Sequence, residues 1–132
     1  MTASNKAAKR ILVVDDQKLV REAVKMMLAV DGYDVETAAG AEHALAVFEA
    51  HKYDVVMVDF EMPKMKGDRL AVLLKERAPR QPIIMLTGHE EQVLANGHAP
   101  AGIDHVIKKP FRLETLREGI ARASAVCAGN AA

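Results

Sequence analysis

The sequence of 132 residues has little cysteine and no net charge, and each shortage excludes a class of protein. Its one cysteine, Cys127, excludes an internal disulfide and a zinc site built from cysteines. Its 18 Lys and Arg residues balance 18 Asp and Glu residues, so it lacks the surplus of positive charge that holds nucleic-acid backbones. We therefore expect no direct nucleic-acid partner.

Long hydrophobic runs are also missing. No apolar run approaches the roughly 18 residues that a membrane-spanning helix needs. Lys9 and Arg10 lead into only four apolar residues, which lack the hydrophobic region of a signal peptide. We expect a cytoplasmic protein with no membrane partner. Because 50% of the residues are hydrophobic, one core can be buried, and we expect a single domain over residues 10–126 between disordered tails at 1–9 and 127–132.

Short apolar runs alternate along the chain with segments of helical spacing. Runs without a polar residue are typical of parallel strands buried on both faces, and the amphipathic segments between them are typical of covering helices. The expected strands lie at 11–14, 35–38, 55–58, 83–86 and 106–107, and the expected helical stripes at 20–28, 44–48, 70–74 and 113–123. A fourth helix beginning at Glu90 should be short or frayed, because Gly97 and Pro100 end it early. The pattern predicts a doubly wound α/β fold.

Polar residues follow the apolar runs at the point where each strand ends. Asp15 and Asp16 follow the first run, Asp59 follows the third, Thr87 the fourth and Lys109 the fifth. In open parallel sheets, ligands bind beyond the carboxyl ends of the strands. We therefore expect three carboxylates, a hydroxyl and an ammonium group at one edge of the sheet.

Three clustered carboxylates need a compensating positive charge. Two like charges about 4 Å apart cost about 4 kcal/mol at an effective dielectric constant near 20. Mg²⁺ takes oxygen ligands and keeps positions open for water or phosphate, and a lysine supplies a second countercharge. A carboxylate beside both cations is a suitable phosphoryl acceptor.

These residues, together with Met62-Pro63, Gly67, Gly88 and Pro110-Phe111, resemble the receiver domain of two-component response regulators. The resemblance covers residues 10–126 and implies a flavodoxin-like fold: a five-stranded parallel sheet in the order 2-1-3-4-5 with five helices on both faces. It implies that Asp59 is the phosphoacceptor. It further implies that Mg²⁺ is held by Asp15, Asp16, Asp59 and the backbone carbonyl of Glu61, and that Thr87 and Lys109 contact the phosphoryl group. The implied donor is a phosphohistidine on a sensor histidine kinase or a histidine phosphotransfer protein.

The sequence departs from the family pattern at two places. Val106 stands where receivers often carry the aromatic ring that turns inward on phosphorylation. The short fourth helix falls on a face that receivers often use for dimers, so we expect a monomer or weak dimer. Glu61 and His89 flank the expected phosphoryl position and influence its lifetime in the family.

Other interpretations of these residues stay open at this point. Asp16 could cap the following helix without any metal. A haloacid-dehalogenase-like phosphatase also uses Asp and Mg²⁺, but Gln17 stands where that family has its second acid. A flavodoxin-like flavin carrier would need a first loop that attracts phosphate, and Asp15-Asp16 would repel it.

The resemblance leaves the output open. We expect a single-domain regulator or phosphorelay intermediate that docks to an unidentified partner. The alternative is a receiver excised from a longer transcriptional regulator or hybrid histidine kinase.

The weak fourth helix leads to a prediction about local stability. Backbone amides of residues 96–103 should exchange with solvent faster than those of the other helical segments, because Gly97 and Pro100 disfavour a continuous helix there. Hydrogen exchange measured by mass spectrometry checks this. Strong protection of residues 96–103 would mean that Gly97 and Pro100 do not interrupt the helix.

Overall fold

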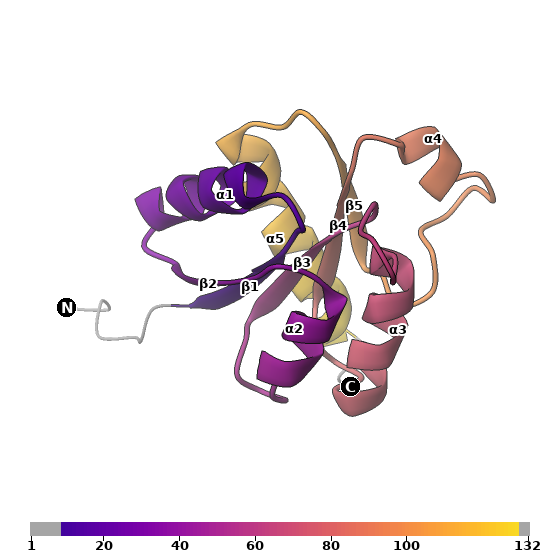
Figure 1. Ribbon diagram of the computed structural model, residues 1–132, viewed down its shortest axis with the longest axis horizontal. Coiled ribbons are helices and arrows are strands. Elements are labelled where there is room, and N and C mark those ends of the chain that lie inside the picture. Colours follow the sequence, from indigo (N-terminus) through magenta and orange to yellow (C-terminus); the bar gives the residue numbers. More distant parts are fainter. Residues whose placement is uncertain (1–8, 130–132) are drawn as a thin grey trace.

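The computed structural model describes residues 9–129, which fold into one α/β domain (Figure 1). Strands and helices alternate along the whole described chain. The elements are β1 Arg10–Val14, α1 Lys18–Val30, β2 Asp34–Ala38, α2 Ala41–Val47, β3 Val55–Asp59, α3 Gly67–Arg77, β4 Ile83–Thr87, α4 Glu90–Val93, β5 His105–Lys108 and α5 Leu113–Gly129. The sheet order is β2-β1-β3-β4-β5 and every pairing is parallel, as the resemblance predicted.

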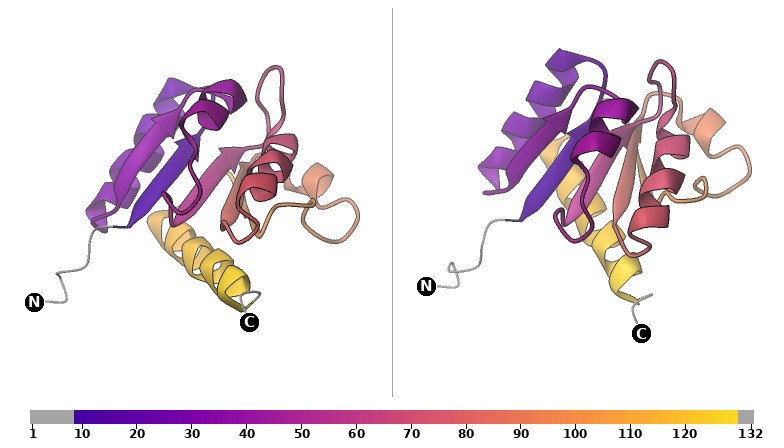
Figure 2. Two further views of the ribbon diagram at one scale, coloured as in Figure 1. Left: turned by 90° about the horizontal axis from the view of Figure 1, so that it is seen from below. Right: turned by 60° about the horizontal axis from the view of Figure 1, so that its bottom comes forward.

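Alternation along the strands divides the core into two layers. In β1, Leu12 and Val14 point to one face of the sheet and Ile11 and Val13 to the other. Leu12 and Val14 pack with residues of α2 and α3, while Ile11 and Val13 pack with residues of α1 and α5. Both views of Figure 2 show this sandwich. Because both faces are covered, the strands consist of nearly unbroken apolar runs.

The fourth helix is as short as predicted. α4 spans only Glu90–Val93, and turns follow it up to β5. The helix ends at Val93, before Gly97, which lies in the irregular segment that follows and adopts a positive φ of 84°, a left-handed conformation that favours glycine. Among residues 9–129, no helix is long and apolar enough to cross a membrane.

The carboxyl end of the domain differs from the prediction. Residues 127–129, which we assigned to a tail, instead belong to α5. The physical reason is a tertiary contact: Cys127 is buried, and its Sγ atom lies 3.8 Å from Lys75 Nζ on α3. The rest of that predicted tail, residues 130–132, lies outside the described residues. So does the predicted tail at residues 1–9, apart from Lys9.

The start of α3 packs against the end of β3. The Gly67 N–H donates a hydrogen bond to the Phe60 carbonyl at 3.0 Å. A Cβ atom at Gly67 would collide with the backbone carbonyl oxygen of Asp59. Only glycine therefore allows α3 to begin this close to Asp59.

This close approach predicts the effect of two substitutions. Gly67→Ala should destabilise the fold by about 1–3 kcal/mol, because backbone lies on both sides of the collision and neither side can yield cheaply. Gly40→Ala is the matched control, since a Cβ atom there meets nothing within 4 Å, and it should cost less than about 1 kcal/mol. Urea unfolding measures both. Equal midpoints for the two variants would contradict a collision at Gly67.

Candidate functional site

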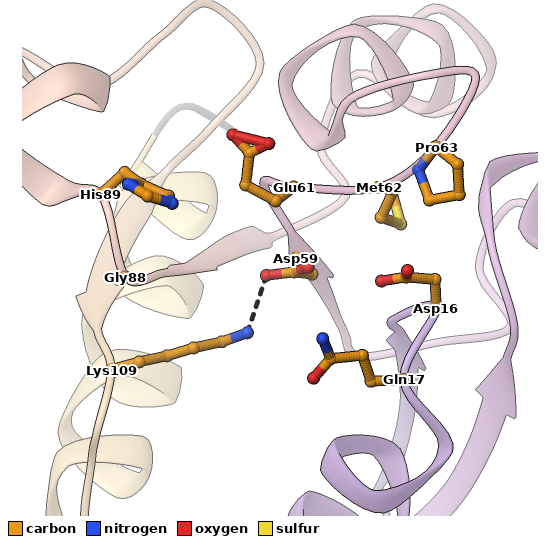
Figure 3. A pocket seen from close by; sticks show the side chains of 9 residues that line it. All are labelled: Asp16, Gln17, Asp59, Glu61, Met62, Pro63, Gly88, His89 and Lys109. Atoms are coloured by element: carbon orange, nitrogen blue, oxygen red, sulfur yellow. Dashed lines mark hydrogen bonds and ion pairs between the residues drawn. The ribbon is translucent and has the colours of Figure 1, made fainter.

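Three aspartates meet at the carboxyl edge of the sheet. Asp15 and Asp16 follow β1, and Asp59 is the last residue of β3. The side chains of Asp15 and Asp59 are buried, whereas Asp16 is exposed. One carboxylate oxygen from each lies within 4.8 Å of the other two. Figure 3 shows Asp16 and Asp59 facing each other across a pocket.

Lys109 supplies the positive charge of this cluster. Its Nζ atom donates a hydrogen bond to Asp59 Oδ1 at 2.8 Å and lies 3.5 Å from Asp15 Oδ2. Its backbone N–H donates to the carbonyl of Thr87 at 2.8 Å, which ties the residue to the end of β4. The Lys109-Pro110 peptide bond is cis. Of the two adjacent lysines, Lys109 reaches the acids and Lys108 is exposed outside this cluster.

One lysine does not compensate the buried acids fully. Burial raises the pKa of Asp59, and the hydrogen bond from Lys109 offsets only part of the rise. Burial likewise raises the pKa of Asp15, against the lowering effects of the Gln17 N–H and of Lys109. Burial alone would lower the pKa of Lys109, but the hydrogen bond and charge of Asp59 outweigh burial and raise that pKa. The site therefore has a capacity for further positive charge.

The buried Oδ2 atom of Asp15, which the Lys109 ammonium group approaches only to 3.5 Å, fits a metal ion. Asp15 Oδ2 is buried and has no hydrogen-bond partner within the described part of the chain. Asp15 Oδ1 is already used, since it accepts the Gln17 N–H at 2.9 Å. A buried carboxylate oxygen without a hydrogen bond is costly unless a cation binds it. Three carboxylates with an open approach are a donor set that suits a hard ion such as Mg²⁺.

An open pocket of about 540 Å³ gives access to the cluster. It is lined by Asp16, Gln17, Asp59, Glu61, Met62, Pro63, Gly88, His89 and Lys109 (Figure 3). Thr87 is buried at the end of β4, next to the lining residue Gly88, and its Oγ1 accepts the His89 N–H at 2.8 Å. The Thr87 hydroxyl retains its own hydrogen for donation.

Two neighbours of the site were not expected from the sequence. Gln17 lines the pocket and occupies the N-cap position of α1, so Asp16 does not occupy the capping position that remained open for it. Lys66 binds the side chain of Glu61, a pairing that neither predicted role of Glu61, the metal-binding carbonyl or the flank of the phosphoryl position, had included. The position of Gln17 directly after Asp16 could have indicated that it lies at the pocket. No periodicity links Lys66 to Glu61, because the two residues lie in an irregular loop.

The chain matches a known protein family over most of its length. The family model described as response regulator receiver domain matches residues 11–121. Response regulator MprA of Mycolicibacterium vanbaalenii is 36% identical over 107 residues, which are 81% of this chain and 46% of that protein. The chain thus spans about half the length of the curated relatives that it matches.

Solved structures agree with this assignment. Response regulator TrrA from Thermotoga maritima, in complex with Mg²⁺-BeF, has a TM-score of 0.78 at 33% identity, covering 87% of this chain and 98% of that one. A response regulator receiver domain protein from Clostridium thermocellum has a TM-score of 0.79 at 30% identity, covering 89% and 95%.

The family that this model describes is a family of signalling domains rather than of classical enzymes. The chain belongs to the response regulator receiver family of two-component systems. Receiver domains bind Mg²⁺ at an acidic pocket, and response regulators generally partner with histidine kinases or phosphotransfer proteins.

The acidic cluster leads to a prediction about Mg²⁺ binding. Asp16→Ala should weaken Mg²⁺ binding roughly tenfold or more, because affinity for a hard cation follows the number of charged oxygen ligands. Glu42→Ala is the control, since Glu42 is exposed on α2 and does not line the pocket. Isothermal titration calorimetry measures both variants. An unchanged affinity of Asp16→Ala would remove Asp16 from the ligand set.

Proposed function

We propose that this chain accepts a phosphoryl group on Asp59 in a Mg²⁺-dependent reaction and then signals to a protein partner. The donor is a phosphohistidine of a sensor histidine kinase or a histidine phosphotransfer protein. The observation that carries the proposal is the position of Asp59. Its carboxylate lines the open pocket, lies beside Asp15 and Asp16, and bonds to Lys109.

The reaction transfers the phosphoryl group from nitrogen to oxygen. A carboxylate oxygen of Asp59 forms a bond to phosphorus while the P–N bond of the phosphohistidine breaks. The electron pair of that bond stays on the imidazole nitrogen, and a donor ring that carries a proton on its other nitrogen leaves as neutral imidazole. The product is an acyl phosphate on Asp59. The open pocket allows the imidazole ring of the donor to approach from solvent.

Charged and polar groups around Asp59 stabilise the phosphoryl oxygens. When Mg²⁺ is bound by Asp15, Asp16, Asp59 and the backbone carbonyl of Glu61, it supplies positive charge to those oxygens. The Lys109 ammonium group lies beside Asp59 and shifts its contact from the carboxylate to the phosphoryl group. The free hydrogen of the Thr87 hydroxyl donates to another phosphoryl oxygen.

The same hydroxyl offers a route by which phosphorylation is transmitted. Thr87 Oγ1 accepts the His89 N–H, and α4 begins at the next residue, Glu90. A shift of the hydroxyl toward a phosphoryl group strains this bond and biases the segment that leads into α4. Val106 lies on β5 opposite Met85 of β4 and is partly buried against the core. It has no ring to turn, so in this chain the signal passes through Thr87 and the loop.

Substitution of the acceptor tests the proposal. Wild-type protein incubated with phosphoramidate and Mg²⁺ should gain the mass of one phosphoryl group, whereas Asp59→Asn should gain none. Asn keeps the shape of the side chain but lacks the nucleophilic carboxylate. Intact-mass spectrometry measures the modification.

A second Asp→Asn variant, close to the same strand, controls for effects of the substitution itself. Asp54 lies just before β3, and its Oδ2 accepts the Arg10 N–H, a bond that the Asn oxygen can keep. Asp54→Asn should be modified like the wild type. Modification of Asp59→Asn at the wild-type rate would refute the acceptor assignment.

A further inference from the structure

Lys66 occupies a position that its side chain suits poorly. It is the N-cap residue of α3 and makes no side-chain capping hydrogen bond. N-cap positions favour Ser, Thr, Asp or Asn, whose oxygens accept a free backbone N–H of the first turn. Lysine has no acceptor, and its positive charge lies at the positive end of the helix dipole. Helix formation therefore does not explain this residue.

The ammonium group of Lys66 is engaged by the rim of the pocket instead. Its Nζ atom lies 3.2 Å from Glu61 Oε1 and 3.0 Å from Glu61 Oε2, so it binds both carboxylate oxygens. The same atom lies 4.9 Å from the centre of the Phe60 ring. Phe60 is itself buried, so the ring is a fixed support for the cation.

Glu61 is the third carboxylate that lines this pocket, after Asp16 and Asp59. Figure 3 shows its side chain above Asp59, between His89 and Met62. Lys109 is already engaged by Asp59 and Asp15, which leaves Lys66 as the cation paired with Glu61 among residues 9–129. Every phosphoryl donor carries negative charge, so a Glu61 carboxylate that turned over Asp59 would repel it.

We propose that Lys66 is a positioning residue for phosphoryl transfer: it holds the Glu61 carboxylate at the rim and offsets its charge, so that an anionic donor reaches Asp59. This proposal rests on the proposed function of Asp59 as acceptor. In this role Lys66 contacts neither the phosphoryl group nor the three aspartates proposed to bind Mg²⁺.

Two small donors of different charge test the role of Lys66. Acetyl phosphate is a dianion at neutral pH. Its phosphorus forms a bond to the Asp59 oxygen, its P–O bond breaks, and acetate leaves with the electron pair. Phosphoramidate carries a single net negative charge. Its P–N bond breaks, and ammonia leaves with the proton that the zwitterion already holds on nitrogen.

The variants are Lys66→Gln, Glu61→Gln, their combination, and Lys64→Gln as a matched control. Lys64 is exposed on the same loop and forms no ion pair within residues 9–129, so its substitution removes an equal charge without releasing Glu61. Initial rates of modification are measured for each variant by intact mass, with both donors and saturating Mg²⁺.

Lys66→Gln should react with acetyl phosphate about fivefold more slowly than wild type, and the loss with phosphoramidate should be smaller because that donor carries less charge. In about 1 M salt, where the screening length is about 3 Å, both losses should shrink. Lys64→Gln should change either rate less than Lys66→Gln does. In the Glu61→Gln background, Lys66→Gln should have no larger effect than Lys64→Gln, since no carboxylate remains to be held.

Equilibrium unfolding separates this role from a structural one. Lys66→Asn introduces a favoured N-cap residue and should move the urea midpoint upward while it slows reaction with acetyl phosphate. A purely structural role would move stability and rate in the same direction.

Equal rates for Lys66→Gln and Lys64→Gln would overturn the proposal, and so would an undiminished effect of Lys66→Gln in the Glu61→Gln background. Failure of the acceptor assignment is distinguishable from both, because then Asp59→Asn would be modified like the wild type.

Discussion

The ion pair between Lys109 and two buried carboxylates is the interaction on which the site depends. Lys109 follows β5, whereas Asp59 ends β3, and β4 lies between those strands in the sheet. The lysine side chain crosses this gap, as Figure 3 shows, and reaches Asp59 at 2.8 Å and Asp15 at 3.5 Å. Strands far apart in the sequence are thus joined at their carboxyl ends by one cation, on the edge where a ligand enters.

The buried acids impose a cost on the fold at neutral pH. Burial raises the pKa of Asp15 and Asp59 above the ordinary value of 3.8, so the folded chain binds protons more readily than the unfolded chain. Their contribution to stability is complete below about pH 3.8 and is lost as the pH rises through their raised folded-state pKa values. The raised pKa of Lys109 acts in the opposite sense, because its stabilising contribution persists until the pH passes above 10.5 and reaches the folded-state value. A bound divalent cation would relieve the remaining cost.

The sequence allowed the sheet and the acidic edge to be predicted because both depend on local patterns. Runs such as 55–58 must be strands buried on both faces, and Asp59 directly after one must lie at its end. Features that depend on tertiary contact were not accessible in this way. The end of α5 depends on Cys127 packing near Lys75 of α3, a contact between segments 52 residues apart. The pairing of Lys66 with Glu61 depends on an irregular loop, where spacing predicts no direction for a side chain.

In the loop at residues 60–67, two residue types that local structure disfavours lie beside the pocket. Phe60 is tied back to Gly67 by a backbone hydrogen bond, and Gly67 lies against the Asp59 carbonyl, so the chain between them must fold over the pocket rim. At the start of α3, Gly67 stands where another residue would favour the helix more, and Lys66 stands where Ser, Thr, Asp or Asn would cap it better. Both choices weaken α3 locally, and both serve the surroundings of Asp59. Functional sites are where sequences are expected to break local preferences. Here the two exceptions are adjacent residues, Gly67 against the Asp59 carbonyl and Lys66 paired with Glu61.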